Sequence, residues 1–216
     1  MVRFITIAID GAAASGKTTT ARSIASLHNF MMVSTGFYYR IITAALLNIG
    51  IYSDQEEEIE NFLSSSKLDT MLIGNDSYMI LNGQSYPEES LREPSINENV
   101  ALFSAIPAVR KFLLEYQRSQ IEFAKDNGFD GIVMEGRDIT SVILPDADLK
   151  FFLEADPKER AARRHEDAES DCVIERDIAD AERTLCNDDV EKIDTGKNDL
   201  SAVVDHISSR IRKLLS

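Results

Sequence analysis

The chain has 216 residues, with 23 Lys plus Arg against 37 Asp plus Glu, so its formal net charge at pH 7 is −14. A negative charge of this size repels polyphosphate backbones and anionic lipids, which excludes generic binding to nucleic acid polymers or membrane surfaces where no basic patch exists, and the sequence has none. The length and the 44% of apolar residues are typical of one globular domain.

Targeting and redox signals are weak. The apolar run 4–9 is too short for a signal peptide, and no apolar stretch approaches the roughly 18 residues that cross a bilayer. The two cysteines, Cys172 and Cys186, form no Cys-x-x-Cys pair, which indicates reduced thiols rather than a disulfide or zinc site. We therefore expect a cytoplasmic protein without a membrane partner.

The N-terminal part of the chain alternates predicted strands with predicted helices. Apolar runs at 4–9 and 30–33 predict buried strands, and the spacing in 17–27 and 37–48 predicts amphipathic helices, the second ending at Gly50. Alternation of this kind predicts an α/β fold with a parallel sheet and helical crossovers.

The segment 51–94 interrupts this alternation. It contains an acidic run at 55–60, followed by β-like runs around the turn signals at 74–76 and 82–83. These features predict an inserted helix and a small antiparallel hairpin.

The α/β pattern returns in the last part of the chain. A long helix is predicted from Pro107 to just before Gly128, then strands at 131–134 and 149–153, and a last helix from about Asn198. Between 156 and 190 the sequence is charged, mostly helical and poor in apolar residues, which is typical of a mobile cover.

The residues from Gly11 to Thr18 match Gly-x-x-x-x-Gly-Lys-[Ser/Thr] at every fixed position. They lie between a predicted strand and a predicted helix, the context that the motif requires. Its backbone N–H groups and the following helix N-terminus bind phosphate, Lys17 reaches the β and γ phosphates, and the Thr18 hydroxyl ligates Mg²⁺. The alternative is a glycine turn with a surface lysine. The expected ATP-binding residues here are Gly11, Ala12, Ala13, Ala14, Ser15, Gly16, Lys17, Thr18 and Thr19.

Three classes of protein share such a loop: a GTPase switch, a small-molecule kinase and a nucleotide sensor without turnover. The sequence has no Asn-Lys-x-Asp motif for guanine. A small-molecule kinase brings together two phosphate groups that repel each other, so it needs arginines beyond the loop. Candidates lie near the ends or on the faces of predicted elements: Arg40, Arg110, Arg137, Arg176 and Arg183. For any one of them, an exposed ion pair is the alternative.

The order and spacing of these segments resemble those of bacterial cytidylate kinases, which phosphorylate CMP and dCMP with ATP. The resemblance covers nearly the whole chain. The segments that carry it are 9–11 with the phosphate loop, 34–36, Tyr39-Arg40, Val109-Arg110, 135–138, 145–148, 159–161, Arg163-Arg164, and Arg176 with Asp180 and Arg183.

The resemblance implies a P-loop NTPase fold with a central parallel five-stranded sheet flanked by helices, and a monomeric enzyme. The core would comprise 1–50, 107–155 and 190–216, with a nucleoside-monophosphate-side insert at 51–94 and a lid at 156–189.

By the same resemblance, Arg40, Arg137 and Arg183 would hold the acceptor phosphate. Arg110 and Asp138 would face the cytosine, whose exocyclic amine donates to a carboxylate.

The remaining roles also follow from the resemblance. Thr35 would join the CMP site, while Arg176 and Asp180 would contact the pentose. Arg160, Arg163 and Arg164 would reach the ATP phosphates, with a surface role as the open alternative for each. The residues expected to be catalytic are Lys17, Arg137 and Arg183.

Two further points stay open at the level of the sequence. Asp10 or Glu135 would hold Mg²⁺ through water, and a turn-capping role is the alternative for Asp10. Ser34 and Ala101 depart from the family pattern, where Asp and a pyrimidine-contacting Ser are expected.

Another small-molecule kinase, such as an adenylate or shikimate kinase, and a non-catalytic nucleotide-binding module remain the alternative functions.

Overall fold

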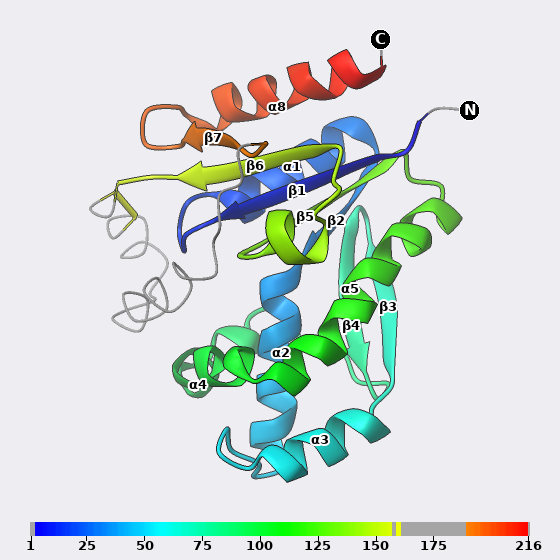
Figure 1. Cartoon of the computed structure of the whole chain (residues 1–216), viewed down its shortest axis with the longest axis vertical. Helices are drawn as coiled ribbons and strands as arrows, with labels where there is room; N and C mark the ends of the chain where they lie inside the picture. The colour runs from blue at the N-terminus through cyan, green and yellow to red at the C-terminus, as the bar shows by residue number, and fades with distance from the viewer. Residues whose placement is uncertain (1–2, 157–158, 161–188, 216) are drawn as a thin grey trace. The chain divides into compact units, whose positions relative to one another are not determined.

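The phosphate loop follows strand β1 (Ile5–Gly11), which lies between β5 (Gly131–Gly136) and β6 (Leu149–Glu154) in the sheet (Figure 1). The chain divides into two compact units: the first unit comprises 1–33 and 120–216, and the second unit comprises 34–119. The computed structural model describes residues 3–156, 159–160 and 189–215.

The strands of the sheet follow the order β2-β5-β1-β6-β7. β1 pairs in parallel with β5 and β6, and β6 pairs in parallel with β7. Their bounds are β1 Ile5–Gly11, β2 Phe30–Ser34, β5 Gly131–Gly136, β6 Leu149–Glu154 and β7 Glu191–Asp194.

Burial fits the inner positions of β1 and β5 in this order. Every residue of β2 and β5 is buried, as a parallel strand covered on both faces requires. The register places Asp10 opposite Gly136, and Gly11 opposite Leu153. The carboxyl ends of β1, β5 and β6 therefore meet at one edge, where ligands bind in open α/β sheets.

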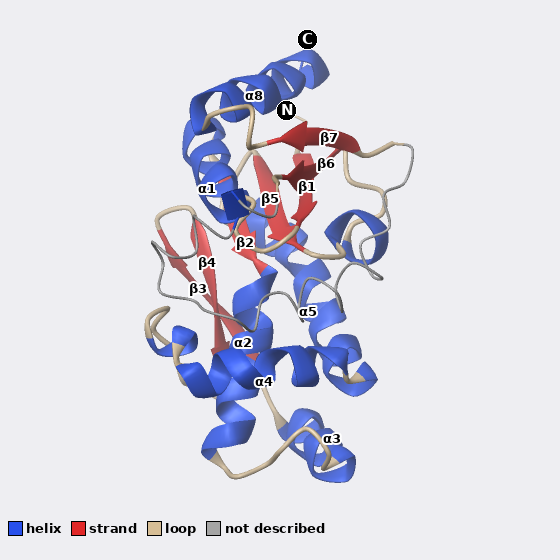
Figure 2. Cartoon of the chain, turned by 90° about the vertical axis from the view of Figure 1, so that its left-hand side faces the viewer, coloured by secondary structure: helices blue, strands red, loops and turns tan. Residues whose placement is uncertain are grey.

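Helices α1 (Lys17–His28) and α8 (Leu200–Leu215) cover one side of these strands (Figure 2). Their apolar faces share a single core with the sheet. Ile24 of α1 and Ile207 of α8 are fully buried in it, together with Ile7 and Val133 from the central strands. Burying a side chain of this size stabilises the fold by roughly 1.5–3 kcal/mol.

The second unit is built around α2, which packs against α4, β4 and the short 3₁₀ turn η1. Phe103 of α4 and Ile42 of α2 are fully buried. α5 starts in this unit and continues into the first. The bounds are α2 Thr35–Asn48, α3 Glu56–Ser65, β3 Leu68–Ile73, β4 Asp76–Leu81, η1 Ser90–Arg92, α4 Pro94–Ala105 and α5 Pro107–Asp126.

β3 and β4 form the expected antiparallel hairpin, which turns at Gly74. Two tyrosines join this hairpin to the neighbouring helices. Tyr38 of α2 lies edge-to-face on Tyr116 of α5, with ring centroids 5.2 Å apart, and the Tyr116 hydroxyl lies 2.8 Å from that of Thr70. Complete burial raises the pKa of Tyr38 well above its ordinary value, so its hydroxyl stays neutral.

The structure confirms the α/β fold with its mostly parallel sheet, and the five parallel strands expected from the resemblance correspond to the sheet of the first unit. The hairpin raises the number of strands in the described residues to seven. Three elements were not expected from the sequence: β7, α4 and the π-helical turn η2 (Ile139–Ile143). Within the described residues, no helix is both long and apolar enough to cross a membrane.

Candidate active site

The phosphate loop joins β1 to α1 as the motif predicts. Gly16 adopts a positive φ of 85°, and its carbonyl accepts the Thr20 N–H at 3.0 Å as α1 begins. Gly11 is needed for a close approach, since a Cβ there would lie 2.2 Å from the Leu153 carbonyl oxygen of β6. The carboxyl end of β6 thus touches the first residue of the loop.

The Lys17 ammonium lies within the loop. Its Nζ donates to the carbonyl oxygen of Ala12 at 2.8 Å, and only 9% of the residue is exposed. A positive charge is therefore held among the backbone N–H groups that a phosphate would contact.

Thr18 and Glu135 meet at the carboxyl edge of β5. The Thr18 hydroxyl donates to Glu135 Oε1 at 3.0 Å, and Glu135 is 4% exposed. A hydroxyl beside a buried carboxylate suits Mg²⁺, which favours oxygen ligands and is held by few protein groups together with substrate phosphates. In the part of the chain that the structure describes, no three His, Cys, Asp or Glu side chains gather as a metal cluster.

Asp10 is engaged by the turn that follows β5. Its Oδ1 accepts the Ile139 N–H at 2.9 Å, and its Oδ2 accepts both the N–H and the hydroxyl of Thr140, at 2.8 and 2.6 Å. Burial raises the pKa of Asp10 and outweighs these hydrogen bonds, which lower it; the nearby Asp138 adds to the rise. These contacts match the turn-capping alternative.

Arg137 and Asp138 form the short link between β5 and η2. Asp138 is 5% exposed, and its carbonyl oxygen accepts the N–H groups of Val142 and Ile143 at 2.9 and 3.1 Å. Both candidate acceptor-site residues therefore lie at the carboxyl edge, one strand away from the phosphate loop.

Two further contacts reach the phosphate loop from distant parts of the chain. The Arg160 Nη1 lies 3.5 Å from the Ala13 carbonyl oxygen, and its Nε donates to that of Ala155 at 3.2 Å. The Thr195 hydroxyl donates to the carbonyl oxygen of Ser15 at 3.1 Å. Arg160 was a candidate, whereas Thr195 was missed, because the strand before it, β7, carries only one buried apolar residue and was not predicted from the sequence.

The second unit contains Thr35, Arg40 and Arg110. Thr35 begins α2 and is buried. Arg40 donates from Nη1 to the Leu91 carbonyl oxygen at 2.7 Å and to Asn97 Oδ1 at 2.5 Å.

Arg110 lies in the first turns of α5, where its Nη1 is 3.3 Å from the Ser104 carbonyl oxygen. Ala101 lies on α4, the helix before it. Five candidates lie outside the described residues: Arg163, Arg164, Arg176, Asp180 and Arg183.

This arrangement defines the class of P-loop nucleotide-binding proteins. A strand leads through a phosphate-binding turn into a helix, Lys17 lies inside the turn, and a hydroxyl–carboxylate pair lies beside it. Comparison with known proteins identifies the family. The family model described as cytidylate kinase matches residues 7–213. The chain belongs to the cytidylate kinase family and is an ATP-dependent phosphotransferase that acts on CMP or dCMP.

The relatives support this family over nearly the whole chain. A cytidylate kinase of Ligilactobacillus salivarius (strain UCC118) is 35% identical over 99% of this chain and 99% of its own length. One from Carboxydothermus hydrogenoformans is 41% identical over 74% of this chain and 68% of its own length. The alternative functions are not favoured.

A solved structure supports the fold. An unliganded sugar kinase from Janibacter sp. HTCC2649 is similar with a TM-score of 0.53 over 97% of this chain and 95% of its own, at 12% sequence identity. Because so low an identity shows the fold alone, it adds no substrate.

Proposed function

We propose that the phosphate loop binds ATP with Mg²⁺, and that Arg137 and Asp138 bind the CMP acceptor beside it. The observation that carries this proposal is the position of Lys17, whose ammonium is held 2.8 Å from a loop carbonyl. An incoming phosphate oxygen is a stronger acceptor for that ammonium than the neutral carbonyl, because both partners are then charged.

The acceptor needs no general base. The phosphate of a nucleoside monophosphate has a second pKa near 6, so its oxygen is already an anionic nucleophile at pH 7. Catalysis then consists of alignment and of stabilising the charge on the transferred phosphoryl group. In this proposal Lys17 stabilises charge on the donor side, while Arg40, Arg137 and Arg183 do so on the acceptor side.

Thr18 and Glu135 are the residues that would hold Mg²⁺. The metal would neutralise charge on the β and γ phosphates. The Thr18 hydroxyl supplies an oxygen ligand, and Glu135 accepts the hydrogen bond of that hydroxyl and orients it. This pair supports Glu135 over Asp10 as the carboxylate near the metal, because both oxygens of Asp10 already accept hydrogen bonds.

Several other proposed residues stay predictions from the family pattern. Arg110 would face the cytosine, Thr35 would line the CMP site, and Arg160 and Arg164 would reach ATP. Arg176 and Asp180 would contact the pentose. The family resemblance also supports the proposed lid at 156–189 and a monomeric, cytoplasmic enzyme, which sedimentation and cell fractionation would test.

The decisive experiment is a substrate panel. ADP release from ATP would be followed with AMP, GMP, CMP, dCMP or UMP as acceptor, with and without Mg²⁺. We expect CMP and dCMP to give the highest kcat/KM and chelation to abolish turnover. Faster reaction with AMP or GMP would contradict the proposed acceptor, and full activity after chelation would contradict the metal.

A further inference from the structure

Asp10 is in an unusual position for a residue next to a phosphate loop. It is the residue directly before Gly11, yet it is 1% exposed and its carboxylate is directed to another element. Taking a carboxylate out of water is costly unless hydrogen bonds compensate it, so a buried one needs a structural reason. Here three donors compensate it, and all of them come from Ile139 and Thr140.

Two of these donors are the first N–H groups of η2, and the third is the Thr140 hydroxyl. The N-terminal N–H groups of a helical turn have no partner inside the turn, so they need an acceptor from elsewhere. Asp10 supplies that acceptor from β1, 129 and 130 residues away in the sequence. The carboxylate is thus a cap for η2 contributed by the strand that carries the phosphate loop.

Together with the pairing of β1 and β5, this cap fixes the chain on both sides of the acceptor-site residues Arg137 and Asp138. Gly136 is held at one end, since it lies opposite Asp10 in the parallel register of β1 and β5. Ile139 is held at the other end by the Asp10 carboxylate. Only Arg137 and Asp138 lie between these two points, so their backbone has little freedom to move relative to Gly11.

We propose that Asp10 is a positioning residue, which sets the distance and orientation of Arg137 and Asp138 relative to the phosphate loop. This inference rests on the proposed function, in which these two residues bind the acceptor nucleotide. Asp10 touches neither nucleotide in this scheme. It acts through the backbone of η2, and its loss should impair the acceptor side of the reaction while leaving ATP binding intact.

The variant Asp10→Asn tests the proposal with little change in volume. One carboxylate oxygen becomes an NH₂ group, which then faces a backbone N–H and cannot accept it. We expect KM for CMP to rise about tenfold or more and kcat to fall, because displacing a reacting group by about 1 Å costs up to about a hundredfold. KM for ATP and the Mg²⁺ concentration for half-maximal rate should change less than about twofold.

Thr140→Val is the second variant, because it removes one of the three hydrogen bonds and retains the shape of the side chain. It should also raise KM for CMP and lower kcat, by smaller factors than Asp10→Asn. It also keeps the proposal testable if Asp10→Asn fails to fold.

Asp148→Asn is the matched control. Asp148 Oδ2 accepts the N–H and the hydroxyl of Thr6 at 2.8 and 2.9 Å, the same type of clamp, near the opposite end of β1. Loss of a carboxylate with a merely structural role should lower the thermal midpoint of unfolding without changing KM for CMP or KM for ATP. We expect this result for Asp148→Asn.

The outcomes separate the two levels of inference. If the unmodified enzyme does not phosphorylate CMP, the proposed function fails. If it does, and Asp10→Asn shifts the Mg²⁺ requirement or KM for ATP, Asp10 serves the metal and the positioning role is wrong. An unchanged KM for CMP in both Asp10→Asn and Thr140→Val would also overturn it.

Discussion

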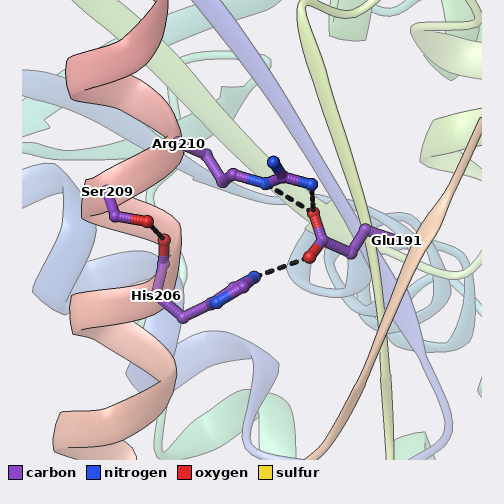
Figure 3. A network of polar contacts seen from close by, with 4 residues as sticks. All are labelled: Glu191, His206, Ser209 and Arg210. Atoms are coloured by element: carbon purple, nitrogen blue, oxygen red, sulfur yellow. Dashed lines mark hydrogen bonds and ion pairs between the residues drawn. The ribbon is translucent and has the colours of Figure 1, made fainter.

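Two places in the first unit use similar side chains in different ways. At the junction of β7 and α8, Glu191 accepts hydrogen bonds from Arg210, at 2.8 and 2.7 Å, and its other oxygen lies 2.6 Å from His206 Nε2 (Figure 3). At the phosphate-loop edge, Lys17 instead binds a loop carbonyl, and Asp10 binds two backbone N–H groups and one hydroxyl. The Glu191 network joins two elements through side chains alone, whereas the contacts of Lys17 and Asp10 with backbone groups also define the local shape of the chain.

The charged residues at the junction of β7 and α8 have a structural role, whereas those at the phosphate-loop edge have a functional one. The network of Glu191, His206 and Arg210 resembles part of a catalytic arrangement, but Ser209 donates to the His206 carbonyl oxygen rather than to its ring (Figure 3). No nucleophile is thus activated there. At the loop edge the hydrogen-bonded backbone forms the surface that a phosphate contacts. Substitutions should therefore affect stability at the junction and turnover at the loop.

The largest expected effect concerns Lys17. In Lys17→Met the aliphatic stem remains and the charge is lost, so kcat should fall by about 10²–10³-fold, as for loss of one transition-state donor. The free energy of unfolding should change by less than about 1 kcal/mol. Kinetic assays with urea titration measure both quantities. The exposed Lys192→Met is the control, and an equal loss of activity in that variant would contradict the assignment.

Gly11→Ala should come next, since it drives a Cβ into the Leu153 carbonyl oxygen at 2.2 Å. We expect a loss of about 1–3 kcal/mol in the free energy of unfolding, together with weaker ATP binding. Gly128→Ala is the matched control, because Gly128 has a positive φ of 77° and no atom within 4 Å of the added Cβ. If both variants lose the same stability, the close approach at Gly11 is unimportant.

A smaller effect is expected at the junction. Partial burial would raise the pKa of Glu191, but the hydrogen bonds from Arg210 and His206 outweigh it and lower the pKa below its ordinary value. A lowered carboxyl pKa stabilises the folded state above the unfolded pKa of about 4.3, and this stabilisation is lost as pH falls through the folded value.

Glu191→Gln tests this sign directly. It should cost about 0.5–1 kcal/mol at pH 7, and the difference from the unmodified protein should vanish as pH falls below about 4. Thermal unfolding across pH 3 to 7 measures it, with the exposed Glu57→Gln as control. A change in kcat for Glu191→Gln would contradict the expectation that this junction contributes to stability and not to turnover.

The smallest effect is expected at Ser15. Its side chain is fully buried, and its Oγ has no hydrogen-bond partner among the described residues. Removing an unsatisfied buried hydroxyl is neutral or stabilising, so Ser15→Ala should raise the free energy of unfolding by about 0–1 kcal/mol. A loss of more than about 1 kcal/mol in calorimetry would show that the hydroxyl has a partner in solution.

The sequence predicts local features better than distant contacts. The phosphate loop was found because its spacing is a local motif between a strand and a helix. The pairing of Asp10 with Thr140 was not, since 130 residues separate them and Thr140 belongs to no motif. Because the sequence does not show which residue Asp10 binds, the roles of metal ligand and turn cap were equally compatible with it.

Two missed elements have different causes. β7 has the sequence Glu-Lys-Ile-Asp, and one buried isoleucine is too little for a strand pattern. α4 does carry a signal, since Ile96, Val100 and Phe103 are buried at helical spacing after Pro94, which occupies its first turn. Edge strands at the end of a sheet thus depend on tertiary pairing, whereas α4 could have been predicted from periodicity.

The contact between Thr195 and Ser15 has a consequence for biosynthesis. The phosphate loop leaves the ribosome first, but the hydroxyl that binds the Ser15 carbonyl lies 180 residues further along the chain. The strand before Thr195, β7, also pairs with β6 only once residues 191–194 have been made. A nascent chain therefore carries an incomplete nucleotide site, and ATP cannot meet the finished loop until the segment with Thr195 has been synthesised.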